Sequence, residues 1–93
     1  MGKIFKGEVM DIEEIEKIFE ETASEWEGEN TMQGLVIITS FLPKSGVEGA
    51  DHDIIYSCYV QDLIDAGAKR EDFVKLAKLN WMIQDNECLA CYV

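Results

Sequence analysis

The longest apolar run of the chain reads Gly34-Leu-Val-Ile-Ile-Thr-Ser-Phe-Leu42, and Pro43 follows it directly. The run is short, rich in β-branched residues and bounded by glycine and proline, which is typical of a strand buried on both faces. Because proline has no backbone N–H, strand pairing should end near Leu42. The pattern predicts a central strand over residues 34–42, with Ile37 and Ile38 both buried and helices covering it.

The residues before this run predict an amphipathic helix over 11–27. Asp11 suits the N-cap position, and Glu14, three residues later, completes a capping-box pair. Gly28 is placed to end the helix. Apolar residues recur at steps of three and four, which puts them on one stripe. The stripe consists of Ile12, Ile15, Ile18, Phe19, Thr22, Ala23 and Trp26.

The chain after the central run predicts a loop and then a second helix. Residues 44–53 are rich in glycine and turn-forming residues and indicate the loop. Residues 54–60 could form a strand on propensity alone. However, the apolar pattern continues to Ala66, Gly67 suits a helix end, and Asp51 or Asp53 could cap the start. These features favour a helix over 54–66 that is apolar nearly all round.

A third helix is predicted over residues 70–84, with Glu71 and Asp72 in its first turn, where the helix dipole favours acids. Its inner stripe would consist of Phe73, Leu76, Ala77, Asn80 and Ile83. The residues that follow, 87–93, form either a last strand or a continuation of this helix.

With a short edge strand over residues 3–9, the element order becomes β-α-β-α-α-β. This order indicates an α+β fold, with a small sheet of two to three strands and about three helices packed on it. The 93 residues correspond to one domain, 1–93, because domains usually span about 100–200 residues.

The apolar content, 47% of the residues, predicts self-association. A chain this short could not wrap an all-apolar helix over 54–66 with its remaining elements. We therefore expect a homodimer whose two-fold interface includes this helix or the Trp81–Met82 segment.

The net charge of −11 argues against direct binding to nucleic acid or to anionic membranes, since both are negatively charged. No segment approaches about 18 consecutive apolar residues, so none is expected to span a membrane. The chain begins without the apolar stretch of a signal peptide, and its three cysteines fit a reducing compartment. We expect a cytoplasmic protein.

Cys88 and Cys91 form a CxxC pattern, which in redox proteins lies at a helix N-terminus. In a strand the two side chains would point to opposite faces, as small apolar residues near the core. A zinc site would need Cys58 and His52 as further ligands, but their spacing is not that of a standard pair. We expect no metal and no cofactor. No motif of a known catalytic class is present, so we expect no enzyme activity.

The predicted 11–27 helix carries more acidic residues than helix stability favours, because like charges four residues apart repel. We expect a small, non-enzymatic binding protein that docks this face on a basic surface of a partner protein. One version mimics the charge of nucleic acid and inhibits a nucleic-acid-handling enzyme, as phage-encoded inhibitors do. The expected contact residues are Glu13, Glu16, Glu20, Glu21, Glu25 and Glu27.

The alternative function is that of an oligomeric protein which binds a small ligand. Tyr56, Tyr59 and Trp81 would then line an aromatic pocket between subunits, since apolar and aromatic side chains line most small-molecule sites.

Overall fold

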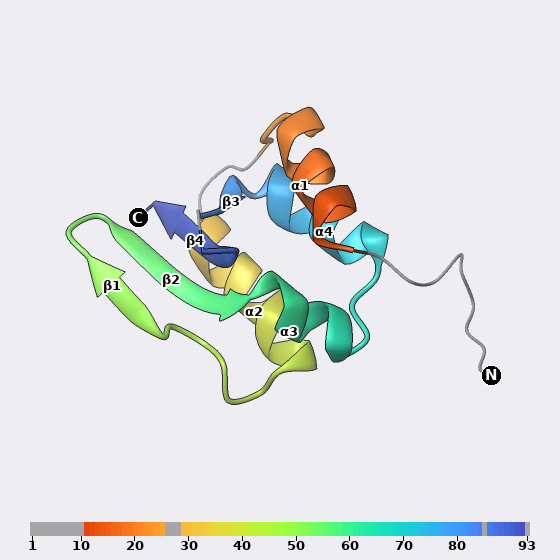
Figure 1. Cartoon of the computed structure of the whole chain (residues 1–93). Helices are drawn as coiled ribbons and strands as arrows, with labels where there is room; N and C mark the ends of the chain where they lie inside the picture. Colours follow the sequence, from red (N-terminus) through yellow and green to blue (C-terminus); the bar gives the residue numbers. More distant parts are fainter. Residues whose placement is uncertain (1–10, 26–28, 85, 93) are drawn as a thin grey trace.

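The computed structural model describes residues 11–25, 29–84 and 86–92. This part of the chain forms an α+β fold with four helices and one four-stranded antiparallel sheet (Figure 1), so the predicted class is confirmed while the element number and order differ. The elements are α1 (Ile12–Glu21), α2 (Asn30–Phe41), β1 (Gly49–Asp51), β2 (Ile54–Tyr59), α3 (Val60–Asp65), α4 (Arg70–Lys78), β3 (Trp81–Ile83) and β4 (Cys88–Tyr92).

The central run at 34–42 lies in helix α2, so the predicted strand is wrong. The sequence of the apolar run shows no helical period. The period appears in the burial pattern of α2, where Asn30, Gly34 and Ile38 are buried at steps of four residues. Ile38 is buried as predicted, whereas Ile37 is only half-buried. The helix ends at Phe41, two residues before Pro43, which could not continue it.

Helix α1 begins as predicted and ends earlier than predicted. The Asp11 carboxylate accepts a hydrogen bond from the Glu14 backbone N–H at 2.9 Å, and both halves of the capping box are present. The helix stops at Glu21 instead of continuing to 27. The backbone N–H of Glu25 donates to the Lys78 carbonyl of α4 at 2.7 Å, so this part of the chain is bonded to another element. Trp26, Gly28 and the strand predicted over 3–9 lie outside the described residues.

The prediction of a helix over 54–66 is wrong for the first half of this range. Residues 49–59 form a β1–β2 hairpin with a turn at His52, and a helix, α3, begins only at Val60. The tyrosines and isoleucines of β2 follow their strand propensity. Asp51 and Asp53 therefore lie at the hairpin turn and cap no helix. Gly67 follows the helix end as predicted, with φ at +102°.

The all-apolar helix over 54–66 that was expected to form a homodimer interface does not exist in the structure. In the structure Cys58, Val60 and Leu63 are buried within the monomer. A homodimer remains a prediction without this support.

The helix predicted over 70–84 is divided into α4 and β3. Phe73, Leu76 and Ala77 are buried as predicted. The chain then turns at Asn80, whose φ is +68°, a left-handed conformation that asparagine tolerates better than most residues. Of the two alternatives for the final segment, the strand is confirmed as β4.

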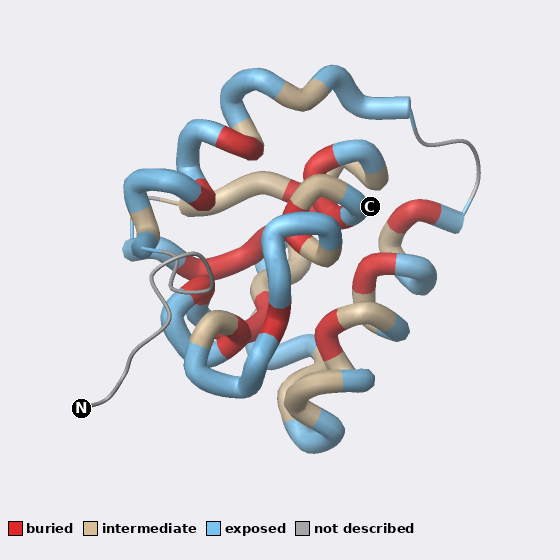
Figure 2. The backbone as a smooth tube through the Cα atoms, turned by 90° about the vertical axis from the view of Figure 1, so that its right-hand side faces the viewer, coloured by how far each residue is buried: buried red, intermediate tan, exposed pale blue. Residues whose placement is uncertain are grey.

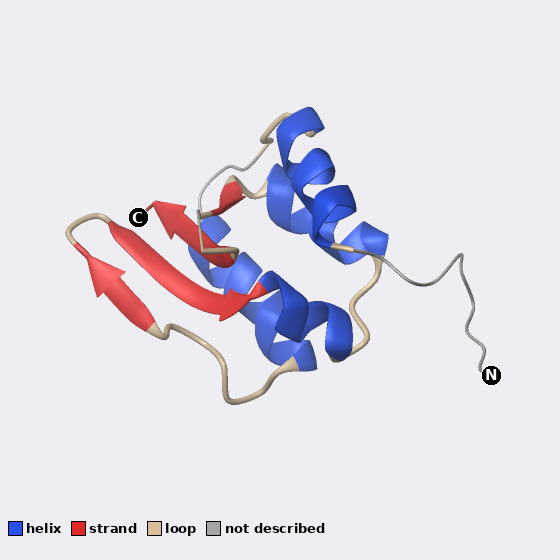
Figure 3. Ribbon diagram, in the orientation of Figure 1, coloured by secondary structure: helices blue, strands red, loops and turns tan. Residues whose placement is uncertain are grey.

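The sheet has the order β1-β2-β4-β3, and α2 packs against one of its faces (Figure 3). The Trp81 indole Nε1–H donates to the Asn30 backbone carbonyl at 3.2 Å and lies directly over Gly34. Cys91, opposite Trp81 in the ladder, accepts a hydrogen bond from Asn30 at 3.2 Å. The remaining pair of long helices, α1 and α4, pack on one another beside the sheet.

No helix among the described residues has the length and apolar character needed to cross a membrane.

Candidate functional site

The predicted acidic face is carried by α1, whose inner side is fixed in the core. Ile15 and Ile18 are buried, and α1 packs along α4. In Figure 2 the buried turns of α1 face inward and its exposed turns face outward. Burying the apolar stripe therefore forces the polar stripe into solvent. The acids exposed on this outer side are Glu13, Glu14, Glu16, Glu20 and Glu21.

None of these carboxylates lies within 4.0 Å of a charged nitrogen of a described Lys or Arg. Among the described residues, the one contact within 4.0 Å between a basic and an acidic side chain joins His52 to Asp51, far from α1 in sequence. Glu13, Glu16 and Glu20 line a shallow hollow of about 360 Å³ along the helix, together with one base, Lys17. The last turn of α1 contains no basic residue. Chemically, the surface can attract and hold cations.

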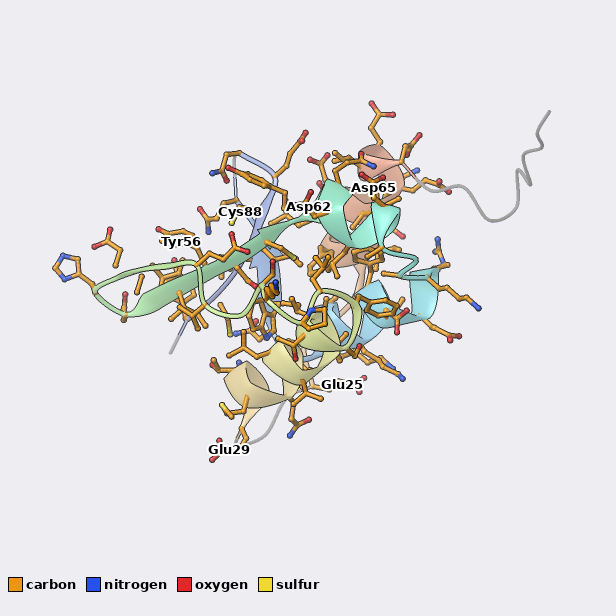
Figure 4. The ribbon with its side chains drawn as sticks, turned by 90° about the horizontal axis from the view of Figure 1, so that it is seen from below. Glu25, Glu29, Tyr56, Asp62, Asp65 and Cys88 are labelled. Atoms are coloured by element: carbon orange, nitrogen blue, oxygen red, sulfur yellow. The ribbon has the colours of Figure 1, made fainter. Side chains whose placement is uncertain are left out.

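The structure separates the six predicted contact residues into three groups. Glu13, Glu16, Glu20 and Glu21 lie together on α1. Glu25 is exposed but lies beyond the helix, and Figure 4 shows it with Glu29 on the α2 side of the molecule. The acidic surface is thus shorter than predicted. The sixth, Glu27, lies outside the described residues.

A second hollow, of about 430 Å³, lies where α1 meets β3. Glu16 and Glu20 form one part of its lining, and Gln84 lies at the end of β3. The apolar part of the lining consists of Phe19, Trp81, Met82 and Ile83. The acidic surface therefore continues into a partly apolar depression, which the sequence did not indicate because β3 was predicted to be helical.

The three cysteines are free and buried, and they do not form the zinc site that was considered. Cys91 faces α2, whereas the Cys88 thiol donates to the Ser57 carbonyl at 3.0 Å on another side of the strand. His52 lies at the hairpin turn with its side chain 92% exposed. Within the described ranges, no group of three His, Cys, Asp or Glu residues could hold a metal ion.

Burial keeps the thiols protonated and therefore unreactive as nucleophiles. Burial, with a smaller effect from the charges of Glu48 and Asp62, raises the pKa of Cys58 from 9.0 to about 12. Burial also raises the pKa of Cys88 and of Cys91. Since the thiolate is the reactive form of cysteine, the raised pKa values lower the reactivity of these residues.

The raised pKa of Cys58 predicts a loss of stability at alkaline pH. The unfolded chain releases this proton near the ordinary value of 9.0, whereas the folded protein keeps it up to about 12. The contribution is therefore complete below pH 9 and is lost as the pH rises towards 12. At about pH 10.5 we expect a loss of about 2 kcal/mol from this residue.

Urea unfolding at about pH 8 and about pH 10.5 measures this loss. The Cys58→Ala variant should be less stable than the wild type at about pH 8 and should lose about 2 kcal/mol less between the two pH values. An equal fall in wild type and variant would show that Cys58 keeps an ordinary pKa.

The aromatic pocket expected from Tyr56, Tyr59 and Trp81 appears in part, as a hollow within one subunit that contains the two tyrosines. It has a volume of about 500 Å³ and contains both Tyr56 and Tyr59, with Glu48, Gln84 and Asn86 around them. The expected third aromatic residue, Trp81, does not join them, because it faces α2. The signal that would have revealed this hollow is the strand register, which is not visible in sequence.

Comparisons with known proteins add nothing to this picture. Protein-family models, curated proteins and solved structures gave no match to the chain.

Proposed function

We propose that this protein is a small, non-enzymatic binding protein that docks the outer face of α1 on a basic surface of a partner protein. The supporting observation is the group Glu13, Glu16, Glu20 and Glu21, all exposed on one short helix and without an ion pair to a described Lys or Arg. Such a surface attracts positively charged partners and speeds their encounter.

The placement of these acids lowers the stability of α1 itself, which supports a role in binding. Glu16 and Glu20 are four residues apart, where like charges repel by about 0.2–0.5 kcal/mol. Glu20 and Glu21 lie in the last turn, where the helix dipole disfavours acids by about 0.3–1 kcal/mol each. A cationic partner would relieve both effects, so part of this cost would return as binding free energy.

A narrower form of the proposal is an inhibitor that mimics nucleic acid. A net charge of −11 would let such a protein occupy the basic channel of a nucleic-acid-handling enzyme, as phage-encoded inhibitors do. In this form the partner surface is one that normally contacts phosphates.

The location of the binding charges can be tested with two variants of equal net charge. The first replaces four acids of α1, and the control replaces four exposed acids elsewhere; each removes four negative charges. The α1 variant is Glu13→Gln, Glu16→Gln, Glu20→Gln, Glu21→Gln. The control variant is Asp51→Asn, Asp53→Asn, Asp65→Asn, Glu71→Gln.

Calorimetric titration with an oligoarginine peptide at low salt provides the measurement, after circular dichroism has confirmed that both variants fold. We expect the α1 variant to lose at least about tenfold in affinity and the control to lose about twofold to threefold, because close charges dominate over distant ones in salt solution. Equal losses would show that only net charge matters, and absence of binding to the wild type would refute the proposal.

A further inference from the structure

Strand β2 contains an irregularity that brings two tyrosines to one face of the sheet. Tyr56 pairs with Ala90 and Tyr59 pairs with Cys88, so three steps along β2 correspond to two steps along β4. One extra residue in a strand is a β-bulge, and it reverses the alternation of side chains beyond it. Residues three apart, which would normally point to opposite faces, therefore share a face here.

This face is the one opposite α2. Cys91 contacts α2 through Asn30, and the neighbouring residue in β4, Ala90, points the other way and is paired with Tyr56. Figure 4 shows Tyr56 and Cys88 on the side of the sheet away from Glu25 and Glu29. Tyr59 is 50% exposed on this face. The face therefore offers aromatic surface to solvent.

The hollow between the tyrosines has a hydrogen-bonded floor and a polar rim. In the floor, Ser57 donates to the Gly46 carbonyl at 2.6 Å and Cys88 donates to the Ser57 carbonyl at 3.0 Å. The rim carries an exposed carboxylate, that of Glu48, and the side-chain amides of Gln84 and Asn86. Among the described residues, no lysine or arginine lines the hollow.

We propose that this hollow binds an arginine side chain of the partner that docks on α1; the inference rests on the proposed function. A guanidinium group stacks on tyrosine faces, where the ring quadrupole attracts it. Glu48 supplies the opposite charge in the planar, two-oxygen form that a guanidinium pairs with best. The side-chain carbonyl oxygens of Gln84 and Asn86 can accept its remaining N–H groups.

Gln84 connects this hollow to the acidic surface. It lines the tyrosine hollow and also the hollow between α1 and β3 that contains Glu16 and Glu20. A basic segment lying on α1 can therefore continue past the end of β3 and place an arginine between Tyr56 and Tyr59. The charges supply attraction over distance, and the tyrosine hollow supplies the preference for arginine over lysine.

Two tyrosines of equal exposure provide a matched pair of variants. Tyr59 lines the hollow and is 50% exposed, whereas Tyr92 is 53% exposed on the same face and does not line it. We expect Tyr59→Leu to weaken binding of an oligoarginine peptide by about fivefold, within the usual strength of cation–π contacts. Tyr92→Leu should change it by less than about twofold.

Titration with an oligolysine peptide of the same length measures the preference of the hollow for arginine over lysine. Wild type and Tyr92→Leu should bind oligoarginine more tightly than oligolysine, and Tyr59→Leu should bind the two about equally. Glu48→Gln should also reduce the preference, whereas Glu87→Gln, an exposed acid outside the hollow, should leave it unchanged. Equal effects of Tyr59→Leu and Tyr92→Leu, or equal binding of the two peptides by wild type, would overturn the inference.

The outcomes separate this inference from the proposed function. Loss of binding in the α1 variant with no effect of Tyr59→Leu would refute the arginine site and leave the acidic docking surface standing. An effect of Tyr59→Leu with none from the α1 variant would refute docking on α1 and retain the hollow as a site of its own. Absence of binding by either peptide would refute both.

Discussion

Replacing Gly34 by alanine should destabilise the protein by about 1–3 kcal/mol. A Cβ at this position would overlap the Nε1 and Cε2 atoms of the Trp81 indole. Trp81 is only 3% exposed and its Nε1–H donates to the Asn30 carbonyl, so the ring cannot move without losing packing and a hydrogen bond. Overpacking costs about 1–3 kcal/mol and the hydrogen bond about 1 kcal/mol, against a gain of about 1 kcal/mol in helix propensity.

Gly46→Ala is the matched control, because a Cβ there would meet no atom within 4 Å. It should change the free energy of unfolding by less than about 0.5 kcal/mol. Urea unfolding of both variants makes the measurement. Equal stabilities of Gly34→Ala and Gly46→Ala would show that α2 does not pack against Trp81 in this way.

Replacing Asn30 by alanine should cost a similar amount, about 2–3 kcal/mol. Asn30 is 7% exposed, and its side-chain N–H groups donate to the Leu79 carbonyl at 2.9 Å and to the Cys91 sulfur at 3.2 Å. The variant leaves the partly buried Leu79 carbonyl without this donor, and an unsatisfied acceptor away from water costs about 1–3 kcal/mol. The lost side chain also leaves a space among α2, α4 and β4.

Gln33→Ala serves as its control, since Gln33 is an exposed amide on the same helix. That variant should be neutral or slightly stabilising, because alanine has the higher helix propensity. If thermal or urea unfolding placed Asn30→Ala within about 0.5 kcal/mol of Gln33→Ala, the buried network would not contribute to stability.

The start of α1 could be predicted from sequence because its signals are local. Asp11 and Glu14 satisfy each other's backbone donors, and Ile15 and Ile18 repeat with the helical period. The end was not predicted, because the apolar period continues beyond Glu21, whereas in the structure Thr22 is already extended. Further along, the Glu25 N–H is bonded to the Lys78 carbonyl of α4, a long-range contact that local pattern does not show.

Helix α2 was mistaken for a strand because nearly every position of its central run is apolar. A continuous apolar run has no period, so sequence cannot separate a buried strand from a buried helix. The features that favour the helix are distant in sequence: Gly34 accommodates Trp81, and Asn30 bonds to Leu79 and Cys91.

The helices predicted over 54–66 and 70–84 are in part strands. The loop predicted over 44–53 includes the turn at His52, but nothing in it indicated that strands flank this turn. His52, Asn80 and Glu87 all have positive φ values, between +44° and +68°, although none is glycine. A glycine at these positions would have marked the turns in the sequence. The β1–β2 hairpin, and with it half of the sheet, therefore escaped detection.

The candidate site was likewise predictable from the sequence only in part. The acids of α1 follow from composition and helical period, so Glu13, Glu16, Glu20 and Glu21 could be named in advance. The hollow at Tyr56 and Tyr59 depends on a bulge, which exists only in the pairing of β2 with β4. No local pattern in the sequence encodes that register.

The most direct test of the central claim is to map the contact of a basic peptide by ¹⁵N–¹H NMR. An oligoarginine peptide is added at low salt, and the amide shifts of the whole chain are followed. Docking through the acidic helix predicts that the largest shifts fall within residues 12–21 of α1 and that they disappear at high salt. Largest shifts at the other exposed acids, around Asp51 and Asp53 of the hairpin turn, or shifts spread evenly over the surface, would contradict it.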